Sequence, residues 1–122
     1  MATLRQRRGS AAESAAARYV HSIGWQIVDR NVRVQRDEID ILAVDPGPPS
    51  ELVCVEVRSA KSAAFGPPEE RVDHLKVAHL YRAMGRLDAS VGRGMSRRVD
   101  LVVVDERAGA RTFRHLRRLE PP

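Results

Sequence analysis

Apolar and polar positions along the chain follow two different periods, and this difference divides the chain into helices and strands. Between residues 9 and 23, apolar side chains recur every three to four positions, which predicts an amphipathic helix. Ser10 can cap its start, and Gly24 follows its end. Runs rich in Val, Ile and Leu predict five strands. These strands are expected at residues 25–34, 38–44, 52–59, 99–104 and 111–116.

Turn signals show how these elements connect. The sequence DPGPPS, residues 45–50, separates the second and third strands and predicts an antiparallel hairpin. A loop rich in Pro and Gly, residues 63–68, leads into a second helix over residues 69–87. The stripe of that helix expected to be buried consists of Val72, Leu75, Ala78, Tyr81 and Met84.

The order of elements is therefore α-β-β-β-α-β-β. A helix between the third and fourth strands permits a right-handed crossover with those two strands parallel. The expected fold class is α/β, with a mixed β-sheet flanked by helices.

Length and composition fit one domain. The chain has 122 residues, and its hydrophobic fraction of 43% is ordinary for a globular protein. Residues 1–8 and 120–122 are expected to be mobile tails. Cys54 is the single cysteine, which rules out an internal disulfide and predicts a small buried side chain. No apolar run is long enough to cross a bilayer, so we expect a cytoplasmic protein without a membrane partner.

The net charge of +5 favours an anionic partner, and nucleic acid is the commonest one. Arginines gather near both ends of the chain and between residues 93 and 98. They suit contacts with phosphates, which give affinity without reading sequence, although a solvated surface explains them too. Aromatic residues make up only 4% of the chain, so a platform for stacking bases is not indicated.

Two carboxylates interrupt strands that otherwise look buried. Asp40 lies in EIDIL, and Glu56 lies in VCVEV. Ionised carboxylates are rarely buried unless they are paired or bind metal. If the hairpin brings Asp40 beside Glu56, a divalent cation such as Mg²⁺ or Mn²⁺ would offset their repulsion. Alternatively, Asp40 pairs with Arg33 or Arg36, and Glu56 pairs with Arg58.

Five short motifs together resemble the uncharacterised protein family 0102. They are GSAAESAAARYV, GWQIVDRNVRV, DEIDILAVD, LVCVEVRSAKSAAFGPP and RRVDLVVVD, and they extend from about residue 9 to residue 105. This bacterial family is similar to Holliday junction resolvases and to the PD-(D/E)XK nuclease superfamily. The resemblance implies a restriction-endonuclease-like core, a metal-dependent nuclease activity and DNA as partner. It also allows a homodimer, because resolvase-like proteins often act as dimers.

The resemblance also implies roles for individual residues. Asp40 and Glu56 match the metal-binding acids of the superfamily, and Glu13 matches a glutamate of the first helix that often completes the site. Arg33 and Lys76 match basic positions that would contact nucleic acid. Glu13 has an alternative role, because the sequence from Ser10 to Glu13 also fits a capping box.

One departure from the family pattern concerns the chemistry itself. Arg58 stands where the family usually has lysine, and Ala60 stands where it usually has arginine. Arginine stays protonated and cannot act as a base, but it can hold a phosphate through two hydrogen bonds. Lys61 is a candidate replacement, although strand alternation places it on the opposite face from Glu56.

Two functions therefore remain open. The first is a Mg²⁺- or Mn²⁺-dependent nuclease that cuts branched or single-stranded DNA, with Asp40, Glu56, Glu13 and Arg58 as its catalytic residues. The second is a nucleic-acid-binding module of the same fold that has lost the chemistry. Elsewhere in the chain, Trp25 is expected in the core, Asp100 is expected to anchor a helix end or loop by hydrogen bonds, and His115 is expected to be a surface or boundary residue.

Overall fold

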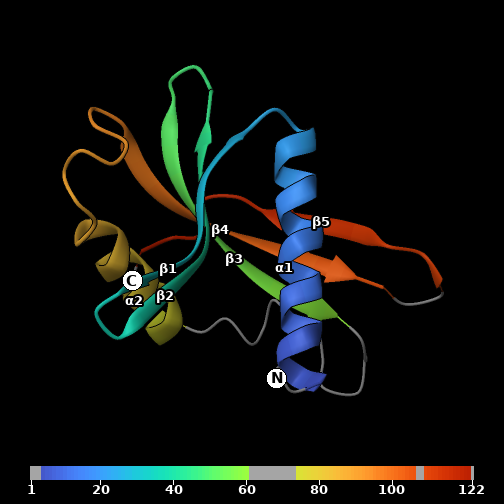
Figure 1. The fold of residues 1–122 in the computed structure, drawn as a ribbon. Coiled ribbons are helices and arrows are strands. Elements are labelled where there is room, and N and C mark those ends of the chain that lie inside the picture. The colour runs from blue at the N-terminus through green and yellow to red at the C-terminus, as the bar shows by residue number, and fades with distance from the viewer. Residues whose placement is uncertain (1–3, 61–73, 107–108, 122) are drawn as a thin grey trace.

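The computed structural model describes residues 4–60, 74–106 and 109–121. Two helices and five strands lie within these ranges (Figure 1). They are α1 (Leu4–Ser22), β1 (Gln26–Val34), β2 (Asp37–Asp45), β3 (Glu51–Ala60), α2 (His74–Gly85), β4 (Ser96–Asp105) and β5 (Thr112–Leu116). The predicted order and the α/β fold class are confirmed, and they are consistent with a restriction-endonuclease-like core.

The five strands form one mixed sheet in the order β1-β2-β3-β4-β5. β3 and β4 are parallel, and α2 lies between them in the chain, as the crossover predicts. The other three neighbouring pairs are antiparallel. The expected hairpin across residues 45–50 is confirmed by the pairing of Asp45 with Glu51.

Each face of the sheet is covered by one helix. Alanines of α1 pack with Val53, Val55 and Val102 on one face, and the small side chains allow the helix to lie close to the strands. Leu80 and Met84 of α2 pack against the other face. Strand alternation thus separates the β3 side chains into two cores, which is why β3 is apolar on both faces.

β2 and β3 separate before either strand ends, which creates a fork in the sheet. Their pairing runs from Asp45 with Glu51 to Ile41 with Val55 and stops there. Beyond that point β2 continues beside β1, while β3 continues beside β4 as far as Ala60. The fork therefore begins at the next position of each strand, which is where the two acids of the sequence motifs stand.

The first helix begins earlier than predicted. It starts at Leu4, so residues 4–8, expected in a tail, form its first turns, and Ser10 lies inside it. Ser10 is consequently not the cap, and the capping-box alternative for Glu13 is wrong, because a cap residue lies outside the helical turn. Gly24 does follow the end of α1, and its φ of 92° explains why glycine suits this position.

The buried stripe of α2 differs from the prediction. The buried residues are Val77, Leu80, Ala83 and Met84. Leu75 is 63% exposed, and Ala78 and Tyr81 are only partly buried. This short helix carries two overlapping apolar stripes, and its packing on the sheet selects the one that contains Leu80. Val72 and the predicted first turn of this helix lie outside the described residues.

A buried polar network holds the C-terminal segment against β4. Asp100 is fully buried and accepts hydrogen bonds from Arg98 Nε (2.9 Å) and from the backbone nitrogen of Arg118 (2.9 Å). His115 Nε2 lies 2.8 Å from Asp100 and its Nδ1 lies 3.0 Å from the Tyr19 hydroxyl. The anchoring role expected of Asp100 is confirmed. His115 was expected at the surface or its boundary, and it is a boundary residue: it is partly buried, and pairing of β5 with β4 brings its side chain into this network.

None of the helices in the described ranges is both long enough and apolar enough to span a membrane.

Candidate active site

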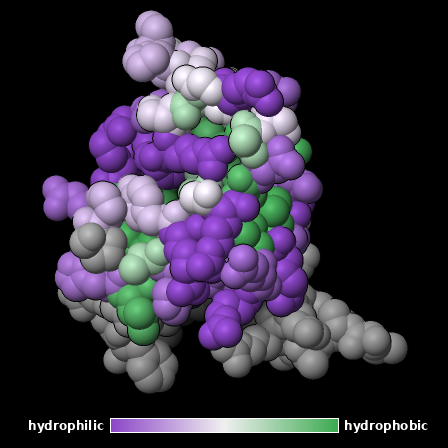
Figure 2. Space-filling model, turned by 90° about the vertical axis from the view of Figure 1, so that its left-hand side faces the viewer, coloured by the Kyte–Doolittle hydropathy of each residue, from purple (hydrophilic) through white to green (hydrophobic). Residues whose placement is uncertain are grey.

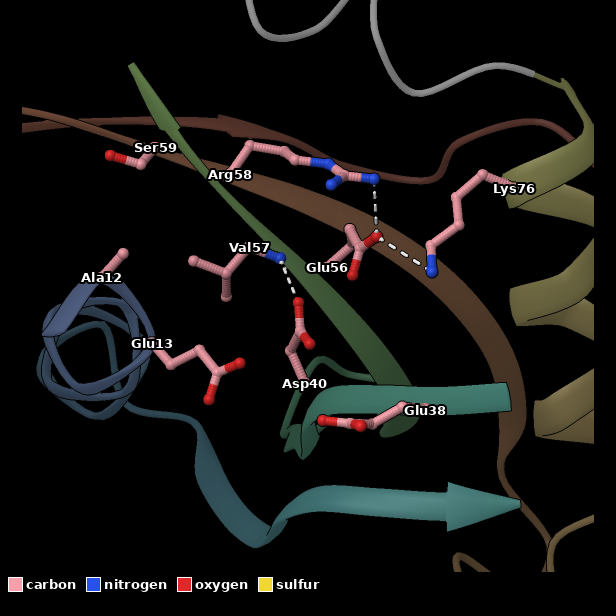
Figure 3. Close-up of a pocket in the computed structure, with 9 residues that line it drawn as sticks. All are labelled: Ala12, Glu13, Glu38, Asp40, Glu56, Val57, Arg58, Ser59 and Lys76. Atoms are coloured by element: carbon pink, nitrogen blue, oxygen red, sulfur yellow. Dashed lines mark hydrogen bonds and ion pairs between the residues drawn. The ribbon is translucent and has the colours of Figure 1, made fainter. Parts of the chain in front are cut away.

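A cleft of about 350 Å³ opens at the fork between β2 and β3 (Figure 3). Its residues come from α1, β2, β3 and α2. They are Ala12, Glu13, Glu38, Asp40, Glu56, Val57, Arg58, Ser59 and Lys76. Because the two helices cover opposite faces of the sheet, only the separation of the strands allows both to reach the same cleft.

Asp40 stands where β2 leaves β3. Its Oδ2 accepts a hydrogen bond of 2.9 Å from the backbone nitrogen of Val57. The side chain therefore satisfies a strand N–H that has lost its ladder partner at the fork. This bond also fixes the carboxylate of Asp40 in the cleft next to Glu56.

Glu56 is only 3% exposed, although it carries a carboxylate. Its Oε2 lies 3.1 Å from Arg58 Nη2 and 3.6 Å from Lys76 Nζ (Figure 3). Burial raises the pKa of Glu56 to about 8, and the neighbouring Asp40 adds to the rise, while Lys76 and Arg58 oppose it. The two cations thus compensate only part of the cost of placing two acids together.

Two further carboxylates, those of Glu13 and Glu38, converge on Asp40. One oxygen each of Glu13, Glu38 and Asp40 lies within 4.8 Å of the others. Burial raises the pKa of Glu13, and the charge of Asp40 raises it further. The negative charge of this group is therefore not fully balanced by the protein.

This carboxylate group fits a hard divalent cation. Three oxygen ligands from separate side chains match the preference of Mg²⁺ and Mn²⁺, which complete their shell with water or phosphate. Glu13, Asp40 and Glu56 were expected in such a set. Glu38 was not, although its position two residues before Asp40 on one strand face was the signal that could have revealed it. Glu56 lies outside the tight group, because it pairs with Arg58 and Lys76 instead.

The basic residues predicted for the site have three different placements. Arg58 and Lys76 line the cleft. Arg33 lies at its margin, where its Nη2 is 3.7 Å from Glu38 Oε2 and its side chain is 73% exposed. Lys61 lies outside the described residues. Of the two ion pairs offered as an alternative to a metal site, the one between Glu56 and Arg58 is present, and Arg33 pairs with Glu38.

Arg58 has unused hydrogen-bonding capacity. Its Nε is buried without a hydrogen-bond partner among the described residues, while its Nη2 contacts Glu56. Cys54, in contrast, is fully buried, and burial raises the pKa of its thiol. Cys54 is therefore a core side chain, as expected, whereas Arg58, whose side chain is 35% exposed, can present its guanidinium to an anionic ligand in the cleft.

The fold and this cleft define a class of small α/β protein in which an acidic site lies at a fork of a mixed sheet. The chain belongs to the uncharacterised protein family UPF0102, whose model matches residues 12–104. A UPF0102 protein of Arthrobacter sp. (strain FB24) is 43% identical over 89% of this chain and 92% of its own length. Another, from Moorella thermoacetica, is 40% identical over 85% of both chains.

Proposed function

We propose that this protein is a metal-dependent nuclease that hydrolyses phosphodiester bonds in branched or single-stranded DNA. The observation that carries the proposal is the composition of one cleft, in which Asp40, Glu56, Glu13 and Glu38 face Arg58 and Lys76. Acids that can hold a divalent ion beside cations that can hold a phosphate are what this hydrolysis requires.

Glu13, Glu38 and Asp40 would hold Mg²⁺ or Mn²⁺, and Glu56 would add a further negative charge beside the ion. When bound there, such an ion would supply an activated water and would neutralise charge on the phosphate. Arg58, whose side chain is 35% exposed, would bind the scissile phosphate through its guanidinium group and stabilise the charge that develops there. Lys76 would add a second positive charge from α2.

The outer surface is compatible with a polyanionic substrate. The face that carries α2 and the β1–β2 hairpin is mostly hydrophilic (Figure 2). Arg33 lies exposed at the margin of the cleft, where it could contact a phosphate next to the one being cut. Together with the net charge of +5, these features support DNA as the partner.

A cleavage assay tests this function. Single-stranded, flapped and four-way DNA would be incubated with Mg²⁺, with Mn²⁺ and with EDTA. We expect cutting that requires metal and is lost in Glu56→Ala. The control is Asp29→Asn, which changes an exposed carboxylate of β1 that does not line the cleft. Cutting that persists in EDTA, or in Glu56→Ala, would exclude the proposed site.

A second function is supported by Arg58 itself. Arginine cannot accept a proton during hydrolysis, and it already pairs with Glu56. A module that binds nucleic acid without cutting it would retain the basic surface and need no metal. DNA binding that is unaffected by EDTA and by Glu56→Ala, without any cleavage, would support this second function.

A further inference from the structure

One residue of β1 has a backbone conformation that strands rarely contain. Asn31 has a φ of 53° and lies between Arg30, which pairs with Ile41, and Val32, which pairs with Ile39. It therefore stands opposite Asp40. The left-handed region is costly for side chains other than glycine, and asparagine tolerates it better than most.

The side chain of Asn31 connects two other elements. Its amide is assigned the orientation in which the nitrogen, not the oxygen, faces the two acids, because only that orientation satisfies both groups. The nitrogen then donates one hydrogen bond to Glu13 Oε2 (2.9 Å) and another to Glu38 Oε1 (3.2 Å). Glu13 belongs to α1 and Glu38 belongs to β2, so a single NH₂ group joins a helix to the neighbouring strand. Both N–H bonds of the amide are used, one for each carboxylate.

We propose that Asn31 is a positioning residue that holds the carboxylates of Glu13 and Glu38 together, so that they can bind a divalent ion with Asp40. This inference rests on the metal site of the proposed function. Without a donor between them, three acids whose oxygens lie within 4.8 Å repel one another and separate. The left-handed φ of Asn31 is a strained backbone conformation that directs its amide toward both acids.

Asparagine combines the two properties that this position requires. Glycine accepts the same φ but carries no donor, whereas aspartate accepts it but adds a fourth negative charge. Exchange of Asn31 for glycine therefore removes the amide and keeps the backbone conformation.

The test is the affinity of Asn31→Gly for Mn²⁺, measured in the absence of DNA by the EPR signal of the free ion. We expect binding about 10- to 100-fold weaker than in the unmodified protein, as is typical when a group supporting metal ligands is removed. The EPR spectrum of the bound ion should also change, because two of its ligands are less well held.

Gln35→Gly is the matched control. Gln35 also has a positive φ, 57°, lies at the end of the same hairpin and is exposed, but it does not line the cleft. It should bind Mn²⁺ like the unmodified protein. Thermal unfolding of both variants separates loss of the amide from loss of the fold.

The outcomes for Asn31 and for the nuclease are distinguishable. Equal Mn²⁺ affinity in Asn31→Gly and Gln35→Gly would overturn the role of Asn31, as would an unmodified protein that does not bind Mn²⁺. If Mn²⁺ binds and depends on Asn31 while no DNA is cut, the nuclease proposal fails and the positioning role stands.

Discussion

At the scale of the residue, Glu56 shows how far the cleft departs from what stability alone would select. Its carboxylate is almost completely buried and lies beside Asp40. Arg58 and Lys76 only partly compensate for this placement. An isosteric neutral side chain should therefore be better tolerated by the fold than the acid itself.

We expect Glu56→Gln to stabilise the metal-free protein, mainly at alkaline pH. The pKa of Glu56 is raised to about 8 in the folded protein, from about 4.5 when unfolded. The folded state thus binds the proton more tightly, and the acid costs stability increasingly as pH rises from about 4.5 through 8. The gain should reach a few kcal/mol above pH 8, since one pKa unit corresponds to about 1.4 kcal/mol.

Urea unfolding at pH 5 and pH 9, without metal, measures this difference. Asp29→Asn, which neutralises an exposed acid, should change stability by less than about 0.5 kcal/mol at both pH values. A loss of stability in Glu56→Gln that is the same at pH 5 and pH 9 would contradict the assigned environment.

Arg58→Lys should raise the rate of DNA cleavage. Lysine keeps the positive charge beside Glu56 and, unlike arginine, can give up its proton in a site of this kind. Positioned general acid–base groups contribute on the order of 10²-fold or more, so an increase of about 10-fold would be readily detected. Single-turnover rates with saturating Mg²⁺ provide the measurement, and Arg33→Lys serves as a control at the margin of the cleft. An unchanged or lower rate in Arg58→Lys would count against this explanation of the departure.

The sequence alone was sufficient to select most of the residues that line the cleft. The residues selected in advance that line the cleft are Asp40, Glu56, Glu13, Arg58 and Lys76. Charged residues stand out within apolar strands, and the family motifs point to the residues on the two helices. Asn31 was not selected, since a positive φ inside a strand leaves no mark in the hydrophobic pattern. Whether these residues catalyse a reaction stays a prediction.

At the scale of the element, α2 shows the limit of helical periodicity. The helix was predicted, but its buried stripe was not, because Leu75 and Leu80 both belong to plausible apolar stripes. Only the position of the helix on the sheet decides between them. The same limit applies to the fork: Asp40 and Glu56 stand where it begins, but the apolar pattern of β2 and β3 does not indicate that their pairing ends there.

Leu80→Ala and Leu75→Ala should therefore differ strongly in stability. Leu80 is 1% exposed, so its truncation should cost about 2–5 kcal/mol through lost burial and the cavity left behind. Leu75 is 63% exposed, and its truncation should cost less than about 0.5 kcal/mol. Denaturant midpoints of the two variants, at constant m-value, provide the comparison. Similar losses in both would place α2 in a different orientation.

At the scale of the whole molecule, the directions of the central strands and the net charge were the most predictable features. The turn at residues 45–50 and the helix between β3 and β4 determine the directions of the central strands. Charge is a property of composition and needs no structure. The path of DNA across the surface is not predictable in this way, because the basic residues are spread over several elements.

Affinity for DNA should fall steeply with salt. Each phosphate contacted adds about −0.9 to the slope of log K against log salt for duplex DNA, and about −0.7 for single strands. Arg33→Ala or Lys76→Ala should reduce the magnitude of the slope by about 1 if each binds one phosphate. Arg111→Ala, which alters the β5 side of the sheet, is the comparison. Fluorescence anisotropy of labelled DNA at several NaCl concentrations gives these slopes, and an affinity independent of salt would argue against a nucleic-acid partner.

Trp25, the single tryptophan, gives the C-terminal segment a built-in optical reporter. Its indole is 4% exposed, and the guanidinium groups of Arg98 and Arg117 lie 5.2 Å and 5.5 Å from its ring. Arg98 binds Glu51, which is five residues, or about 16 Å, along β3 from Glu56. The fluorescence of Trp25 should consequently report docking of the C-terminal segment and global unfolding. It should change little when metal or DNA binds in the cleft. Intrinsic fluorescence is thus suited to stability measurements in the presence of metal or DNA, and binding itself calls for an extrinsic label.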